Sequence, residues 1–141
     1  METLHYPLQV SNEQVVKKLM STVLIVDDSV TLRQIVTDLL KKSGLNVVEA
    51  SDCIEAIENI KANCPDLVIT DVVMPRMNGY EFCRWLKNDP AAKGIPVVMC
   101  TSKSQEFDRY WGMKQGADAY ISKPFHPAEL VETVKQLLRS V

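Results

Sequence analysis

Residues 66–79 read DLVITDVVMPRMNG, a short apolar run (67–69) followed by an aspartate and by a loop that contains proline, asparagine and glycine. Four more apolar runs occur in the chain, at residues 23–26, 47–48, 97–99 and 119–121. All five are near-continuously apolar instead of polar at alternate positions, which is typical of strands covered on both faces. We therefore expect five buried strands.

Segments with helical periodicity separate these runs, because their apolar residues recur every three or four positions. The segments are Leu32 to Leu40 ended by Gly44, Ile54 to Ile60 after Ser51 or Asp52, Phe82 to Leu86 ended by Asp89-Pro90, Ser104 to Gln115 ended by Gly116, and a last one from Pro127. Strands that alternate with helices predict an α/β fold, a doubly wound, five-stranded parallel sheet with helices on both faces.

The composition is that of an ordinary globular protein. The 141 residues are 46% hydrophobic, and 16 basic against 18 acidic residues give a net charge of −2. This balance gives no support to nucleic-acid binding, which calls for a basic surface. No apolar run approaches the roughly 18 residues of a membrane span, and no secretion signal is visible. We expect neither membrane insertion nor export.

The four cysteines, Cys53, Cys64, Cys83 and Cys100, form no CxxC pair. A zinc site or a disulfide framework is therefore not indicated, and we interpret all four as free thiols in a reducing cytoplasm. A redox role for Cys53 is an open alternative, although no residue near it would visibly lower its pKa.

Residues 1–19 lie outside the pattern of strands and helices, and we assign residues 20–141 to one domain. The leader has only a weak helical stripe, Val15, Val16 and Leu19. We interpret it as a tail or a short surface helix, because chain termini are usually loosely held. A docking or dimerising arm is the alternative.

Polar residues stand at the carboxyl ends of the predicted strands. Asp27 and Asp28 follow the first strand, Asp71 the third, Thr101 the fourth and Lys123 the fifth. In an open parallel sheet these ends share one edge, where ligands bind. We therefore expect three carboxylates, a hydroxyl and an ammonium to converge on one site.

Such a group of side chains is suited to phosphoryl transfer. Carboxylates that lie close together repel one another or recruit a cation, and oxygen ligands without His or Cys favour Mg²⁺. A carboxylate can itself attack phosphorus and form an aspartyl phosphate. A lysine and a hydroxyl then supply charge and a hydrogen bond to the transferred group.

Four motifs in order resemble the receiver domain of two-component response regulators. They are Asp27-Asp28, DVVMPRMNG at 71–79, Thr101-Ser102 and Lys123-Pro124-Phe125. The resemblance covers roughly residues 21–141 and implies the flavodoxin-like (CheY-like) architecture with strand order 2-1-3-4-5. The string WGMKQGA at 111–117 is further similar to stand-alone receivers of the PilG/PilH type, from twitching and phototaxis systems.

The resemblance implies roles in phosphorylation. Asp71 is expected to accept a phosphoryl group from a histidine kinase, CheA-like or hybrid. Thr101 is expected to hydrogen-bond that group, and Lys123 to pair with it. The peptide bond before Pro124 is expected to be cis.

The resemblance also implies a Mg²⁺ site. Asp28, Asp71 and the backbone carbonyl of Val73 are expected to bind the ion directly, and Asp27 through water. Val73 stands two positions after the acceptor, where the family tunes attack by water. An apolar side chain cannot orient that water, so we expect a moderately long-lived phosphoryl state.

Output is expected through protein–protein contacts. Thr101 and Tyr120 would form the conformational switch, acting on the face made by the fourth helix (104–115), the fifth strand and the fifth helix. Because the chain ends with that helix, we expect no DNA-binding or enzymatic effector. We expect a monomer or weak dimer that functions in motility or taxis.

Simpler interpretations remain for individual residues. Asp27-Asp28 alone would suit a helix cap, and Tyr120 could be a half-buried strand aromatic. Phe107 and Trp111 lie four positions apart, and such a stripe more often faces the core than a partner.

Two rival functions are a phosphate-independent, receiver-like interaction module and a Mg²⁺-dependent phosphatase with an aspartyl nucleophile. The phosphatase would call for a second acid where Val73 stands, so we expect a signalling protein and not an enzyme.

Overall fold

A computed structural model of the chain describes residues 21–139, in which strands and helices alternate. The strands are β1 (Thr22–Val26), β2 (Asn46–Ala50), β3 (Leu67–Thr70), β4 (Val97–Thr101) and β5 (Ala119–Ser122). The helices are α2 (Val30–Lys42), α3 (Cys53–Ala62), α4 (Gly79–Asn88), α5 (Glu106–Lys114) and α6 (Pro127–Arg139). The leader at 1–19 lies outside the described residues, so the interpretations of it stay predictions.

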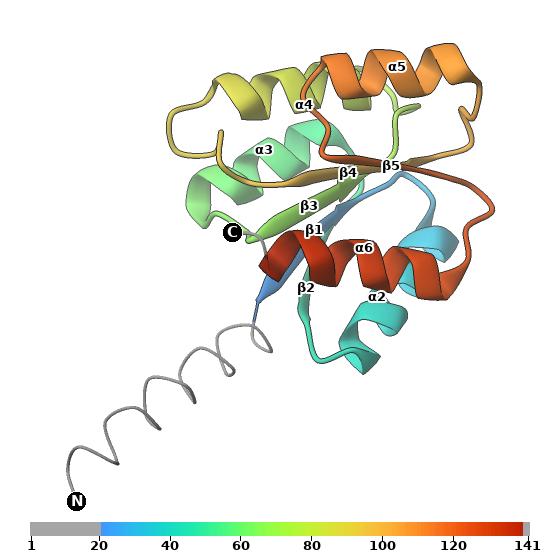
Figure 1. The fold of residues 1–141 in the computed structure, drawn as a ribbon. Helices are drawn as coiled ribbons and strands as arrows, with labels where there is room; N and C mark the ends of the chain where they lie inside the picture. Colours follow the sequence, from blue (N-terminus) through green and yellow to red (C-terminus); the bar gives the residue numbers. More distant parts are fainter. Residues whose placement is uncertain (1–20, 140–141) are drawn as a thin grey trace, which may run out of the picture.

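The strands form one parallel sheet in the order β2-β1-β3-β4-β5 (Figure 1). The chain moves outward from β1 to β2 and then returns past β1 to β3, so the order reverses between β1 and β3. This is the position at which open α/β sheets bind ligands. The predicted fold class and strand order are confirmed.

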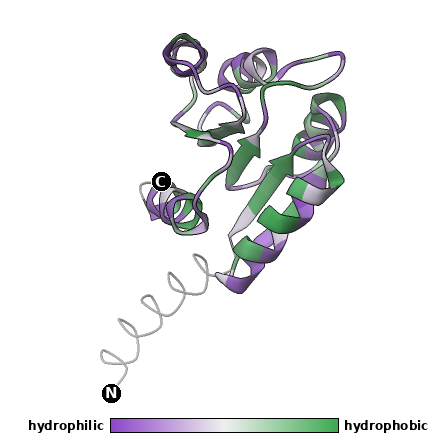
Figure 2. Ribbon diagram, turned by 90° about the vertical axis from the view of Figure 1, so that its right-hand side faces the viewer, coloured by the Kyte–Doolittle hydropathy of each residue, from purple (hydrophilic) through white to green (hydrophobic). Residues whose placement is uncertain are grey.

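Helices cover both faces of the sheet. α2 and α6 lie on one face, while α3, α4 and α5 lie on the other (Figure 1). Neighbouring strand residues point to opposite faces of the sheet. Leu24 therefore packs with Phe82 on the face covered by α3, α4 and α5, and Ile25 packs with Leu40 on the face covered by α2 and α6. Figure 2 shows strands coloured as hydrophobic at the centre and helices that carry both colours.

The edge strand β2 departs from the prediction that every strand is covered on both faces. It has one neighbouring strand, β1, and most of its residues are exposed or half-buried. Val48 is 42% exposed. The apolar pattern of this run predicted a strand, but its position at the edge of the sheet leaves it less covered than the central strands.

The start of α5 also differs from the prediction. The helix begins at Glu106 and not at Ser104, because Gln105 is its N-cap. The backbone N–H of Gln105 donates to the carboxylate of Asp108 at 3.2 Å, which closes the first turn at that point.

The predicted placement of the α5 aromatic stripe in the core is wrong. The residue that α5 buries is Gly112, and the side chains of Phe107 and Trp111 remain 70% and 41% exposed. A Cβ atom at Gly112 would lie 2.9 Å from both the Met99 sulfur and the Tyr120 ring. The helix therefore packs on the sheet through its glycine and turns its aromatic side chains outward.

Candidate functional site

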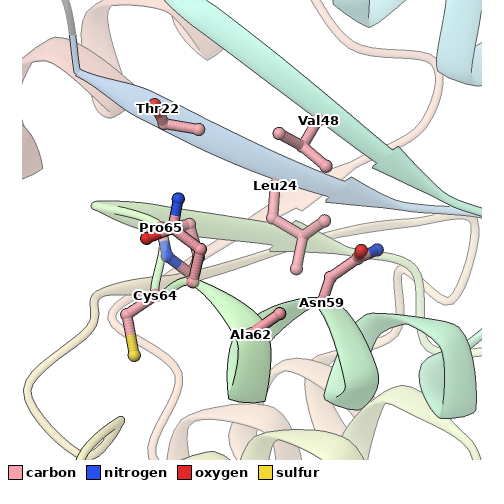
Figure 3. Close-up of a pocket in the computed structure, with 8 residues that line it drawn as sticks. Thr22, Leu24, Val48, Asn59, Ala62, Cys64 and Pro65 are labelled. Atoms are coloured by element: carbon pink, nitrogen blue, oxygen red, sulfur yellow. The ribbon is translucent and has the colours of Figure 1, made fainter.

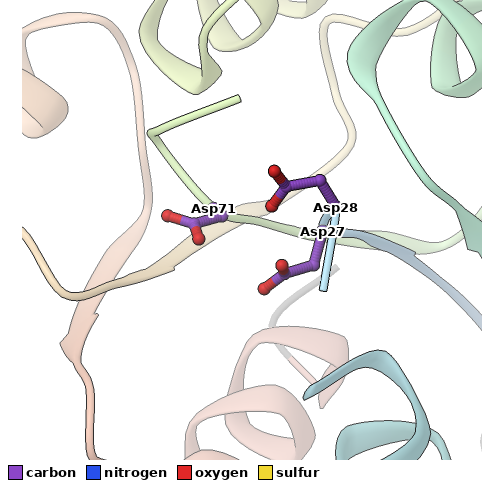
Figure 4. Close-up of side chains that lie close together, drawn as sticks. All are labelled: Asp27, Asp28 and Asp71. Atoms are coloured by element: carbon purple, nitrogen blue, oxygen red, sulfur yellow. The ribbon is translucent and has the colours of Figure 1, made fainter. Parts of the chain in front are cut away.

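Three carboxylates gather at the carboxyl edge of the sheet (Figure 4). Asp27 and Asp28 follow β1 and Asp71 follows β3, and these strands are neighbours at the reversal of strand order. One carboxylate oxygen from each residue lies within 4.8 Å of the others. Asp27 is buried, whereas Asp28 is exposed. The predicted convergence of these three acids is therefore observed.

Lys123 joins two of these acids. Its Nζ atom lies 2.8 Å from Oδ2 of Asp27 and 3.0 Å from Oδ2 of Asp71. Burial of the ammonium acts to lower the pKa of Lys123, but hydrogen bonds to the two carboxylates outweigh it, so the pKa is raised above its ordinary value. The peptide bond between Lys123 and Pro124 is cis, as the resemblance implied.

Backbone groups fix the Asp71 carboxylate. Its Oδ1 atom accepts hydrogen bonds from the backbone N–H of Val72 at 2.6 Å and of Val73 at 3.3 Å. Gly79 lies so close that a Cβ there would come within 2.1 Å of the Asp71 carbonyl oxygen. Only glycine allows this approach, and it places the start of α4 directly beside the Asp71 backbone.

Thr101 and Tyr120 lie on the next two strands, β4 and β5. Thr101 is fully buried, and the Lys123 N–H donates to its carbonyl oxygen at 2.8 Å. The Tyr120 side chain is 5% exposed, so it is buried and not half-buried. Its hydroxyl donates to the Lys103 carbonyl oxygen at 2.6 Å. Burial, followed by a hydrogen bond with Tyr80, raises the pKa of Tyr120.

The structure adds two residues that we did not predict. Arg33 donates from Nη1 to the carbonyl oxygen of Asp27 at 2.7 Å. The Tyr80 hydroxyl donates to the Asp108 carbonyl oxygen at 3.1 Å and so links α4 to α5. Both are long side chains that reach another element. Arg33 stands six positions after Asp27 in the sequence. This spacing predicts the contact between them only if the position of α2 relative to the end of β1 is already known.

The acidic cluster fits a hard divalent cation. It consists of carboxylates alone, and such oxygen donors favour Mg²⁺ over zinc or copper. Asp28 and Val73 are both exposed to solvent, 55% for Val73, so water can complete the ligand shell. The donor set and its solvent access therefore fit an ion of the Mg²⁺ class.

A different hollow lies at the opposite edge of the sheet, where β1 begins and α3 ends (Figure 3). Its volume is about 230 Å³, and Thr22, Leu24, Val48 and Cys64 belong to its lining. The lining has no charged side chain. It therefore lacks the groups that phosphoryl chemistry calls for.

With the fold and the edge cluster in place, comparison with known proteins decides the family. The response regulator receiver domain family matches residues 23–135. The chain belongs to this family. The receiver is thus a signalling module of two-component systems.

Known relatives extend this result. The receiver is 40% identical to protein PilG of Pseudomonas aeruginosa over 113 residues, 80% of this chain and 84% of PilG. It is 38% identical to the phosphate regulon transcriptional regulatory protein PhoB of Escherichia coli over 84% of this chain. The chain spans about half of PhoB, because the match covers 52% of that protein. The predicted similarity to PilG-type regulators is confirmed.

Solved structures show the same fold. The chemotaxis protein CheY4 of Vibrio cholerae superposes with a TM-score of 0.79 at 34% identity, over 84% of this chain and 98% of that one. The receiver domain of a histidine kinase from Syntrophus aciditrophicus gives a TM-score of 0.81 at 37% identity, over 86% of this chain and 92% of that one.

Between residues 21 and 139, none of the receiver's helices is long and apolar enough to cross a bilayer.

Proposed function

We propose that the receiver accepts a phosphoryl group on Asp71 from a histidine kinase. The observation that carries the proposal is the position of the Lys123 ammonium between Asp71 and Asp27. In the transfer, an Asp71 oxygen forms a bond to phosphorus as the N–P bond of the kinase's phosphohistidine breaks. The electron pair of that bond stays on the imidazole nitrogen. Lys123 pairs with the new negative charge, and Thr101 donates a hydrogen bond to it.

The proposed direct ligands of Mg²⁺ are Asp28, Asp71 and the backbone carbonyl of Val73. Asp27 would bind the ion through a water molecule. When bound, the ion supplies neutralisation of charge on the phosphoryl oxygens. The carboxylate cluster and its exposed side support this assignment. Within it, Lys123 has the task of keeping the acids together before the phosphoryl group arrives.

The phosphoryl group would act on the β4–α5 region through Thr101 and Tyr120. Thr101 borders Lys123, and the Tyr120 hydroxyl holds the Lys103 backbone two residues beyond Thr101. Movement of Thr101 toward a phosphoryl oxygen would change the Lys103 segment and release Tyr120 to rotate. Phosphorylation would then bias the equilibrium between two pre-existing states.

The α5–β5–α6 face is the proposed output surface for a downstream protein. Four large apolar side chains of α5 are exposed: Phe107, Tyr110, Trp111 and Met113. Phe107, Tyr110 and Trp111 are spaced i, i+3 and i+4 and therefore share one side of the helix, and an exposed apolar patch commonly marks a protein-binding surface. Similarity to PilG supports a role for the receiver in motility of the type IV pilus kind, exerted through that partner.

We assign residues 20–141 to the receiver domain and 1–19 to an extension, supported by the family match over 23–135. We also place the protein in the cytoplasm. Support comes from its cysteines, since Cys53, Cys64, Cys83 and Cys100 are all free thiols.

Mass spectrometry after incubation with acetyl phosphate and Mg²⁺ tests the proposal. The wild type should gain the mass of one phosphoryl group, and the Asp71→Asn variant should gain none. Asp38→Asn is the matched control, because Asp38 is an exposed aspartate on α2. Phosphorylation of Asp71→Asn to the wild-type level would refute Asp71 as the acceptor.

Two alternatives give other outcomes. A phosphate-independent interaction module would show normal signalling in cells that carry Asp71→Asn. A phosphatase would turn over a small phosphate ester repeatedly without accumulating the acyl phosphate. Val73 stands where that chemistry calls for a second acid, and its apolar side chain argues against turnover.

A further inference from the structure

Arg33 lies at the end of the first turn of α2 and reaches back to the acidic cluster. Its side chain is 15% exposed. Nη1 donates to the carbonyl oxygen of Asp27 at 2.7 Å, and Nε donates to Oε1 of Glu49 on β2 at 3.1 Å. The guanidinium of Arg33 thus links the backbone of Asp27 to the side chain of Glu49 on the edge strand β2.

The contact with Asp27 controls the backbone that leads into Asp28. The Asp27 carbonyl belongs to the peptide group that joins these two residues. On the other side, the N–H of Ser29 donates to Oδ1 of Asp27 at 2.9 Å, and Ser29 Oγ accepts from the N–H of Leu32 at 3.2 Å. The turn between β1 and α2 is therefore held at both ends, with Arg33 holding the first.

Asp28 depends on this turn for its orientation. Its carboxylate is exposed and accepts no hydrogen bond from any residue between 21 and 139. By contrast, both carboxylate oxygens of Asp27 have partners, Ser29 N–H and the Lys123 ammonium. The backbone alone aims Asp28 at the shared space, so any group that fixes this backbone also fixes Asp28.

We propose that Arg33 is a positioning residue for the divalent cation, acting through the Asp27–Asp28 peptide group and anchored by Glu49. The inference rests on the proposed function, in which this cluster binds Mg²⁺. Groups that orient metal ligands typically change metal affinity 10- to 100-fold when they are removed. Arg33 touches no ligand atom directly, so the lower end of this range, about 10-fold, is expected.

The direction in which Mg²⁺ affinity changes distinguishes a positioning role of Arg33 from a purely electrostatic one. A guanidinium near three carboxylates repels a cation, so loss of its charge alone would tighten Mg²⁺ binding. Loss of positioning would weaken binding instead. Lysine keeps the charge, but its single ammonium cannot reproduce the two-ended contact with Asp27 and Glu49. A charge role therefore predicts wild-type affinity for Arg33→Lys, and a positioning role predicts weaker binding.

Calorimetric titration of the full chain with Mg²⁺ provides the test, with urea unfolding of each variant alongside. Arg33→Met should weaken Mg²⁺ binding about 10-fold and Arg33→Lys several-fold. Arg84→Met is the matched control, because Arg84 on α4 bonds Gln115 at 2.6 Å and has no contact with the cluster. Its affinity should equal that of the wild type.

Three results would overturn the inference: tighter or unchanged binding by Arg33→Met, wild-type affinity of Arg33→Lys, or a lower unfolding free energy in both variants with unchanged affinity. A wild type that takes up no Mg²⁺ would refute the proposed metal site as well. If the wild type binds Mg²⁺ and is phosphorylated on Asp71 while Arg33→Lys behaves identically, only the role of Arg33 is refuted.

Discussion

The Nζ atom of Lys123 lies 3.0 Å from Oδ2 of Asp71, although β4 separates the strands that lead to these two residues. The same Nζ atom lies 2.8 Å from Oδ2 of Asp27, which follows β1. One ammonium therefore balances two carboxylates that belong to different strands and would otherwise repel each other. This ammonium holds Asp27 and Asp71 together across the sheet.

The first prediction concerns the stability that Lys123 supplies. Lys123→Met leaves the buried carboxylates of Asp27 and Asp71 facing each other without a cation, which should lower the free energy of unfolding at neutral pH by about 3 kcal/mol, the lower end of the cost of removing one partner from a buried ion pair. Urea unfolding measures this change. Addition of Mg²⁺ should restore part of it, because the ion replaces the missing charge.

The pH dependence of this contribution follows from the raised pKa of Lys123. The folded protein holds the lysine proton more tightly than the unfolded chain does. The stabilisation is therefore complete below the ordinary lysine pKa of about 10.4 and is lost as the pH rises through the higher folded pKa. The difference between wild type and Lys123→Met should shrink above that pH. Lys103→Met, at a lysine 45% exposed and 3.7 Å from Asp108, should show little difference at any pH.

The second prediction concerns the lifetime of the phosphoryl group. Val73 is 55% exposed beside Asp71 and offers no hydrogen bond to an attacking water. Val73→Asn introduces an amide that can orient this water, so phosphate should be released several-fold faster. A time course of phosphate release from the two phosphorylated proteins measures the effect. Equal lifetimes would contradict the assignment of Val73 as a protecting residue.

The third prediction separates the cysteines by reactivity. Burial, with nearby Asp52 and Glu81 adding to it, raises the pKa of Cys53 to about 12. Burial likewise raises the pKa of Cys83 to about 11 and of Cys100 to about 12. Cys64 is exposed. Because the thiolate is the reactive form, iodoacetamide should alkylate Cys64 alone in the native protein and all four cysteines in urea.

Peptide mapping by mass spectrometry after a short exposure to iodoacetamide measures this order. Rapid modification of Cys53 in the native protein would contradict it and would favour the redox interpretation of that residue. Cys64→Ser should leave the native protein unreactive on the same time scale.

The fourth prediction compares two phenylalanines on the same side of the sheet. Phe107 on α5 is 70% exposed, so Phe107→Ser should change the free energy of unfolding by less than about 0.5 kcal/mol. Phe82 on α4 is fully buried, so Phe82→Ala should lower it by about 3–5 kcal/mol. Urea unfolding of both variants provides the measurement. A large loss from Phe107→Ser would contradict the exposed position of the α5 stripe.

The convergence of the acids with Lys123 was predictable from sequence for a simple topological reason. Apolar runs fix where strands end, and in a parallel sheet those ends lie at one edge. Asp28, Asp71 and Lys123 needed only this rule to be placed together. Thr101 followed from the same rule, at the end of β4.

The features that the sequence did not predict depend on how helices and strands pack against one another. Helical periodicity showed that Phe107 and Trp111 share a side of α5, but not which side meets the sheet. The small size of Gly112 decides that. The exposure of Val48 follows from the edge position of β2, which the resemblance implied but which the apolar run by itself does not reveal. The contacts of Arg33 and Tyr80 depend on long side chains that reach another element.

The last prediction concerns the contact through which α5 meets the sheet. A Cβ at Gly112 would lie 2.9 Å from the Met99 sulfur and from two atoms of the Tyr120 ring. Overpacking of this kind costs about 1–3 kcal/mol, whereas alanine gains about 1 kcal/mol over glycine inside a helix. Gly112→Ala should therefore lower the free energy of unfolding by about 1 kcal/mol.

Gly94→Ala is the matched control for this substitution, because a Cβ there meets nothing within 4 Å. It should leave the free energy of unfolding unchanged or slightly raised. In a Tyr120→Leu background the penalty of Gly112→Ala should shrink, since the ring that the methyl group strikes is gone. An equal penalty in both backgrounds would show that the Tyr120 ring does not set how closely α5 approaches the sheet.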